Sequence, residues 1–348
     1  MNKYIYIAFF SLCFTSFSIK QDISFGYDDN FMRFSDLELN SFYLESNTEN
    51  DYLGDSKTYD SGIVSSSIQL TLGQEFFDKN KFNLVSKIKY NEYTSSNQKS
   101  YASFLTRLEF KLAPYSWFKF SYSILPKYYL RTYIDRDFFP LNYFPCYFSS
   151  ESLYLSYSHK LPIKKTWIDY KIVFNNQFYN EHFTEYDSKI IGFEGTIKSK
   201  KIKKYYTSIT YLFYDSNNIS YNNPKISEST KIDRSYIKNG LKFNIKRTFK
   251  KDYLISSASF KFYFNRRFYD LNSFYYESDN WKIYNDYDFR LELSKKINNK
   301  FNVQILGRHF FRSVESSQSN EVIWIEDYKN HTRNEIWLKF VYNFSKSS

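Results

Sequence analysis

The chain has 348 residues, a formal net charge of +11 and a mean hydropathy of −0.58. Aromatic residues make up 22% of it, with 36 Tyr and 37 Phe, which is roughly twice their share in an ordinary globular protein. After the first twenty residues no apolar run approaches the ~18 residues of a membrane-spanning helix, so a helical membrane protein is excluded. Lysine and arginine occur singly rather than in runs, which argues against nucleic acid as a partner.

The first 18 residues read as a cleaved signal peptide. Lys3 supplies the positive start, residues 4–14 are apolar, and residues 16–18 place small side chains at the expected cleavage position. A short membrane anchor is the alternative, but the run is too short for it. The sequence therefore predicts an exported chain in which residues 19–348 form a single domain.

The cysteines restrict the chemistry of the mature chain. Cys13 falls in the predicted signal peptide and lacks the small preceding residue of a lipoprotein signal. Cys146 would then be the only cysteine, so neither an internal disulfide nor a cysteine-based metal site is possible. We expect no cofactor and no metal.

Side chains alternate between apolar and polar along almost the whole chain. Residues 107–112, 118–124, 241–246 and 287–293 are clear examples. A period of two indicates strands with one oily and one charged face. Fourteen such stretches follow in chain order: 22–31, 62–74, 82–92, 100–112, 117–131, 150–160, 166–178, 188–199, 204–215, 234–248, 253–267, 282–296, 301–313 and 332–344. The first is the weakest, and losing it with one other would leave twelve.

The connections alternate between tight turns and longer polar segments. The turns fall near residues 78–81, 113–116, 161–165, 200–203, 250–252 and 298–300. This rhythm is typical of an all-β, transmembrane, up-and-down antiparallel β-barrel. A soluble β-sandwich also alternates, but its strands are about half as long. Aromatic residues also end many apolar faces, as membrane girdles do: Tyr115, Trp117, Trp167, Tyr205, Tyr253, Trp337 and Tyr342.

The last strand carries Phe340, Tyr342 and Phe344 on one face. In this respect, and in its strand pattern, the mature chain resembles bacterial outer-membrane β-barrel proteins, meaning porins and related transport barrels. The resemblance implies a Gram-negative outer membrane, contact with its lipid and lipopolysaccharide, and recognition of the C-terminal strand by the barrel-assembly machinery. Two departures are the four residues after Phe344 and Lys339, where the class often has glycine. They prevent assignment to a named family.

If the apolar face meets lipid, the other face lines a lumen with more basic than acidic residues. The predicted pore-lining residues are Lys87, Lys89, Arg107, Lys111, Lys119, Lys127, Arg131, Lys171, Lys242, Lys246, Lys261, Arg290, Arg308 and Arg312. Such a face gives the lumen a positive potential. We therefore expect a porin-like channel for passive diffusion of small polar, preferably anionic, solutes. The alternative is a closed structural, adhesive or assembly barrel that acts through its long extracellular loops, with the lumen charges paired to acids.

The connection at residues 132–148 is unusually aromatic for a loop. Phe138, Phe139, Tyr143 and Phe144 would form a constriction if this segment folds into the lumen. The same rings would suit a stacking surface for a sugar, or simple packing over the barrel rim.

An enzyme is not expected. The four histidines, His159, His182, His309 and His331, fall at different heights of the predicted barrel, and a catalytic pair needs partners within hydrogen-bond reach. His182, close to two glutamates, leaves a loop-borne acid–histidine site as the alternative. The acidic segments 28–30 and 285–288 lack the spacing of a calcium loop and are expected to be solvated.

Overall fold

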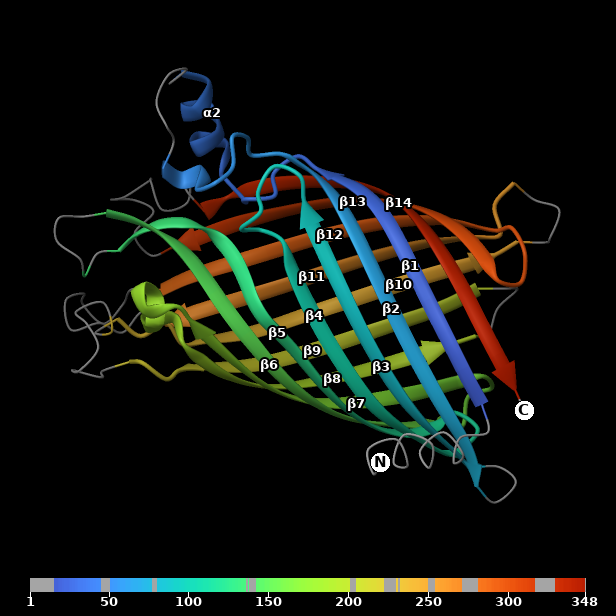
Figure 1. Cartoon of the computed structure of the whole chain (residues 1–348). Helices are drawn as coiled ribbons and strands as arrows, with labels where there is room; N and C mark the ends of the chain where they lie inside the picture. The colour runs from blue at the N-terminus through green and yellow to red at the C-terminus, as the bar shows by residue number, and fades with distance from the viewer. Residues whose placement is uncertain are drawn as a thin grey trace, which may run out of the picture.

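A computed structural model describes residues 16–44, 51–76, 80–135, 137, 142–200, 205–221, 230, 232–249, 254–270, 281–316 and 329–347. Within these residues, fourteen antiparallel strands form one closed barrel (Figure 1). They are β1 (Ser16–Asp28), β2 (Ser61–Phe76), β3 (Asn80–Tyr93), β4 (Tyr101–Ala113), β5 (Ser116–Asp135), β6 (Asn142–Lys160), β7 (Thr166–Tyr179), β8 (Ser188–Ser199), β9 (Tyr205–Asn218), β10 (Tyr236–Thr248), β11 (Ser257–Asp270), β12 (Trp281–Lys296), β13 (Phe301–Ser316) and β14 (His331–Ser347).

Each strand pairs with its sequence neighbours, and β1 closes the barrel by pairing with β14 from Ser16↔Ser347 to Asp28↔Glu335. The prediction of fourteen strands is confirmed, and the twelve-strand alternative is wrong. Both ends of the described chain lie at the end of the barrel that carries the tight turns. We call this the turn end, and the opposite end the mouth.

Among the described residues, helical structure occurs only in connections at the mouth. The β1–β2 connection contains α2 (Asp36–Leu44) and η1 (Asp51–Leu53), and the β7–β8 connection contains η3 (Glu181–Tyr186). The sequence pattern had indicated loops at all three places. No helix among the described residues is long and apolar enough to cross a membrane.

Strand boundaries differ substantially from the predicted ones in two regions, the start of β1 and the β5–β6 hairpin. β1 begins at Ser16 rather than residue 22, because residues 16–21 pair with both β14 and β2. β5 and β6 run far into the segment predicted as a loop at 132–148, since Asp135 pairs with Asn142. Register shifts between Leu125/Tyr128 and Tyr129/Thr132 interrupt the alternation there and hide the strand from the sequence pattern.

The two faces of the wall follow the predicted alternation. Large apolar side chains such as Phe110, Phe118 and Leu291 are exposed on the outside. Their polar neighbours in sequence point inward, where they pair with residues of other strands.

Three tryptophans correct the girdle prediction. Trp337 lies on the inner face, because a Cβ added at Gly26 opposite it would meet its ring. Trp117 and Trp167 also occupy inner-face positions, since they alternate in step with Lys119 and Lys171. Tyr253 lies outside the described residues.

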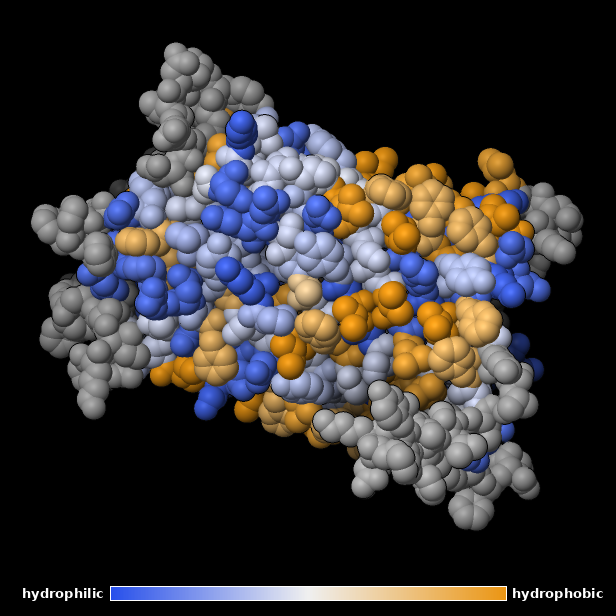
Figure 2. Space-filling view, viewed as in Figure 1, coloured by the Kyte–Doolittle hydropathy of each residue, from blue (hydrophilic) through white to orange (hydrophobic). Residues whose placement is uncertain are grey.

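The outward face changes from apolar to polar partway toward the mouth. Cross-strand neighbours on this face form polar rows, with Glu151–Asn176–Lys189 on β6–β8 and Asn239–Arg266–Asn285 on β10–β12. In Figure 2 hydrophobic side chains gather over the turn half of the visible face, and hydrophilic ones over the mouth half. The strands therefore continue beyond the apolar band at the mouth.

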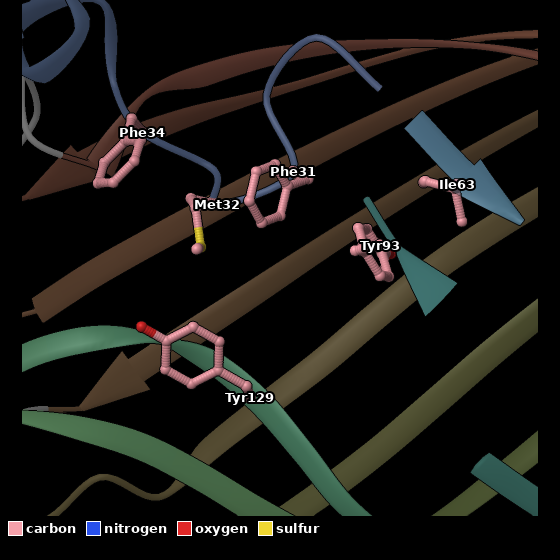
Figure 3. Packing of buried hydrophobic residues seen from close by; sticks show 6 residues of the cluster. All are labelled: Phe31, Met32, Phe34, Ile63, Tyr93 and Tyr129. Atoms are coloured by element: carbon pink, nitrogen blue, oxygen red, sulfur yellow. The ribbon is translucent and has the colours of Figure 1, made fainter. Parts of the chain in front are cut away.

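The largest cluster of buried apolar residues lies inside the mouth. After β1 the chain turns inward, and its residues Phe31, Met32 and Phe34 pack with Ile63, Tyr93 and Tyr129 of the inner wall (Figure 3). We call residues Asn30–Ser35 the mouth segment. It lies against the inner face of β2, β3 and β5, so part of the barrel entrance is filled by the chain itself.

Candidate functional site

Asn30 holds the mouth segment in a tight turn. Its side-chain oxygen accepts a hydrogen bond from the Phe34 N–H (2.8 Å), and its side-chain amide donates to the Phe34 carbonyl (2.7 Å). This loop places Arg33 in the left-handed region, with φ of 62°, a conformation that is strained for a residue with a Cβ. The arginine side chain is exposed at the mouth.

The mouth segment is clamped to the wall by an ion pair. Ser35 and Glu38 form a capping box at the start of α2, with each side chain accepting from the other's backbone N–H. The Glu38 carboxylate also forms an ion pair with the Arg131 guanidinium of β5, through two N–O contacts of 2.9 and 3.0 Å. Both side chains are more than nine-tenths buried. Arg131 was predicted to line the pore; its guanidinium is instead occupied by this clamp.

Two predicted basic residues, Lys171 of β7 and Lys242 of β10, converge on one carboxylate. Glu194 of β8 binds Lys171 at 3.4 Å and Lys242 at 3.3 Å, and accepts a hydrogen bond from Tyr214. On β4 and β5, Glu109 similarly binds Arg107 at 2.8 Å and Lys119 at 3.6 Å. Each carboxylate thus joins two cations on the inner face.

A longer charge network crosses β12, β13, β14 and β1. Asp288 binds both Arg290 and Arg308 at 2.7 Å. Arg308 also binds Glu335 at 2.6 Å. Arg333 then links Glu335 to Asp28, which is fully buried. The network alternates in sign, so most of its charge is compensated within the wall.

Other predicted basic residues have little local compensation. Lys87 and Lys89 lie close to Asp22, whose carboxylate already binds Lys339 at 2.9 Å. Among the described residues, no ion pair involves Lys111, Lys127 or Lys246. Lys127 lies 3.9 Å from the Tyr147 ring centre. The two remaining predicted residues are paired, Lys261 with Glu292 and Arg312 with Asp286.

Sequence reasoning missed several charged residues of the inner wall. Asp28, Asp286 and Asp288 were expected to be solvated, but all three are buried and paired with arginines, so this expectation was wrong. Asp22, Arg333 and Glu335 were absent from the predicted lumen set. On β14 these two residues, Arg333 and Glu335, lie on the face opposite Phe340, Tyr342 and Phe344, and extending that alternation would have identified them.

Of the four aromatic residues predicted to form a constriction, two lie in a strand and two lie outside the described residues. Tyr143 and Phe144 belong to β6, opposite Ile134 and Tyr133, and not to a loop. Phe138 and Phe139 lie outside the described residues. The segment that the structure places inside the entrance is the mouth segment, contributed by the first connection.

His182 of η3 contacts the top of the tall β5–β6 hairpin. Its Nδ1 lies 2.9 Å from Asp135, and its ring stacks on Phe144 with 3.7 Å between centres. Phe183 beside it packs edge-on against Tyr133. His182 thus docks η3 onto β5 and β6. Within the described part of the chain, no group of three histidine, cysteine or acidic residues is arranged to hold a metal ion.

Comparisons with known proteins return structures but no sequence relatives. No family model matches the chain, and no curated protein matches it. A loop-deletion form of OmpT, an outer-membrane protein of Vibrio cholerae, is similar over 95% of this chain and 100% of its own, at 8% identity and a TM-score of 0.45. The outer-membrane channel DcaP of Acinetobacter baumannii is similar over 94% and 97%, at 10% identity and a TM-score of 0.45. Pseudomonas aeruginosa OpdQ is similar over 95% and 98%, at 11% identity and a TM-score of 0.38.

These similarities are too distant to identify a family or to transfer a function. The chain is, by its own strand order and closure, a fourteen-stranded antiparallel β-barrel with an apolar outer band and a charged inner wall.

Proposed function

We propose that the protein is an outer-membrane channel for passive diffusion of small polar solutes, with a preference for anions. The observation that carries the proposal is the inner wall, where basic residues recur on β3, β5, β7, β10 and β12–β14 of a closed barrel with an apolar exterior. A fourteen-stranded barrel is wider than the eight-stranded barrels that side chains fill completely. No catalytic activity forms part of this proposal.

The proposal includes a route to the membrane. Residues 1–18 would act as an export signal, whose cleavage would leave β1 to begin at Ile19. Phe340, Tyr342 and Phe344 would present the C-terminal strand to the barrel-assembly machinery. The apolar band would then contact outer-membrane lipid, with lipopolysaccharide around the mouth half.

The anion preference rests on uncompensated rather than paired cations. Lys87, Lys89 and Lys339 share the single carboxylate of Asp22 on adjoining strands. Charges on the wall of a confined aqueous path bias its potential far more than isolated surface charges do. The arginines of β12–β14 are paired with carboxylates. They shape the lumen and supply hydrogen-bond donors, but they add less to its net positive potential than the uncompensated lysines do.

Purified protein in planar bilayers tests the proposal. We expect stepwise conductance and, under a KCl gradient, a reversal potential of the sign that reports chloride preference. Replacing Lys87 and Lys89 together by glutamine should lower the chloride-to-potassium permeability ratio about two- to threefold, by analogy with other changes of one or two charges in a screened field. Lys189→Gln provides a control with the same chemistry, because this exposed lysine lies on the outer face of β8 and its charge is outside the lumen. Absence of conductance steps, or preference for potassium, would overturn the proposal.

One set of observations favours a second function, a closed barrel that acts through its extracellular connections. The inner charges are extensively paired, and the mouth segment fills part of the entrance. The same recordings separate the two functions, because a closed barrel inserts without producing conductance steps.

A further inference from the structure

Three cations surround one tyrosine ring near the mouth. Tyr284 of β12 is buried, and its ring centre lies 5.0 Å from Lys282 Nζ, 5.0 Å from Arg312 Cζ and 5.6 Å from Arg267 Cζ. Lys282 lies also 4.9 Å from the Tyr269 ring. We call Arg267, Lys282, Tyr284, Asp286 and Arg312 the Tyr284 cluster. It is contributed by β11, β12 and β13.

A single carboxylate lies within this cluster. Asp286 binds Arg267 and Arg312, each at 2.6 Å. Among the described residues Lys282 has no ion-pair partner, and its ammonium is held by the two aromatic rings. The cluster therefore carries about two uncompensated positive charges.

The cluster is accessible to solutes. The side chains of Arg267 and Arg312 are 22% and 15% exposed to solvent. The bonds to Asp286 use one nitrogen of Arg267 and two of Arg312. Since a guanidinium carries five N–H donors in a fixed fork, both arginines keep donors outside the pair with Asp286.

A fourth cation approaches from the β13–β14 connection. Lys329 lies just before β14, and its Nζ is 6.0 Å from the ring of Tyr133 on β5. Burial, and then the nearby charges of Arg131, Lys282 and Arg312, lower the pKa of Lys329 to about 8, although Glu38 opposes them. The surroundings of Lys329 are thus net positive even with that glutamate included.

The height of the cluster suits a solute entering from outside. Arg266, Asn285 and Ser313, which follow one another across β11–β13, form the polar row of the outer face beside these residues. The cluster therefore lies at the mouth-side edge of the apolar band, where a solute leaves open water for the barrel interior.

We propose that the Tyr284 cluster is a binding site for multivalent anions of the phosphate class, which the channel captures at its entrance. The proposal rests on the proposed function and specifies its solute. Two excess charges match a dianion better than a monovalent ion, and arginine forks suit tetrahedral phosphate oxygens. Asp286 acts as a positioning residue that holds the two guanidinium groups in place.

Calorimetric titration of inorganic pyrophosphate into the detergent-solubilised barrel at pH 7 tests the site. We expect saturable binding that weakens at least tenfold in Lys282→Gln and in Arg312→Gln, and that acetate does not reproduce. Lys246→Gln is the matched control, since this inner-wall lysine is remote from the cluster and should leave binding unchanged. Unaltered circular dichroism would show that each variant keeps the barrel.

The outcomes for this site are independent of conduction, because equilibrium binding needs no current. Absence of pyrophosphate binding by the wild type, or equal binding by Lys282→Gln, would overturn the site even if the barrel conducts. Binding by a barrel that never conducts would support the site and reject its role in permeation.

Discussion

Glu185 of η3 is a residue whose environment changes its acid–base chemistry. Its side chain is buried. Burial raises its pKa from the usual 4.5 to about 7, and the nearby carboxylates Asp135 and Asp137 act in the same direction, while Arg234 opposes them. Between these two pKa values the folded protein therefore binds more protons at this site than the unfolded chain does.

This proton uptake predicts how η3 responds to pH. Protonated Glu185 contributes stability that is fully present below pH 4.5 and is lost as the pH rises through about 7. From pH 5 to pH 8, hydrogen exchange of the residue 180–187 amides, corrected for intrinsic rates, should accelerate about tenfold or more, since one pKa unit is worth about 1.4 kcal/mol. Glu185→Gln should abolish that acceleration. Glu181→Gln, an exposed glutamate of the same helix, should retain it, and equal behaviour of the two variants would contradict the assignment.

At the scale of elements, the mouth segment and α2 behave as one unit tied to β5. Phe31, Met32 and Phe34 supply the apolar contacts, and the ion pair between Glu38 and Arg131 closes the unit. Lys99 of the β3–β4 connection adds a hydrogen bond from its Nζ to the Leu130 carbonyl at 2.8 Å and lies over the Phe31 ring. Two connections of the chain, β1–β2 and β3–β4, thus meet against β5 at the entrance.

Removing one partner of the clamp should release this unit. Arg131→Met removes the guanidinium that pairs with the buried Glu38 carboxylate, and breaking a buried ion pair by removing one partner typically costs about 3–5 kcal/mol. We expect trypsin to cleave at the exposed Arg33 much faster in this variant than in the wild type, while the strands remain protected. Lys246→Met, with no ion pair among the described residues, is the control. Equal cleavage rates in Arg131→Met and the wild type would show that apolar packing alone retains the segment.

For the molecule as a whole, the outer face defines where the membrane lies. Leu291 is six residues from Asn285 along β12, which is about 20 Å of strand and about 14 Å of depth at a tilt of 45°. The apolar band of such barrels is about 25 Å tall. Leu291 should therefore lie near mid-membrane and Arg266 at the mouth-side edge.

Depth measurement checks this placement. A fluorophore attached at Leu291→Cys should be quenched by a lipid-chain nitroxide, and one at Arg266→Cys by aqueous iodide. Cys146 is buried and should react poorly, so unsubstituted protein supplies the background. Quenching of both positions by the same agent would place the membrane elsewhere on the barrel.

The sequence by itself determined the strands, their number and the two faces of the wall. A period of two is a local property of the sequence. The residues next to Arg107, Phe110 and Leu291 are enough to assign each of these side chains to the inner or the outer face. The alternation failed where it is physically interrupted, at the β5 bulges that turned a predicted loop into part of a strand.

Only the tertiary structure decided which charges are paired and what fills the entrance. Arg333 meets Asp28 across 305 positions of sequence, because β14 closes on β1. The Tyr284 cluster likewise needs three strands in register. No local pattern encodes such contacts, because ring closure and register determine which side chains share one height of the wall.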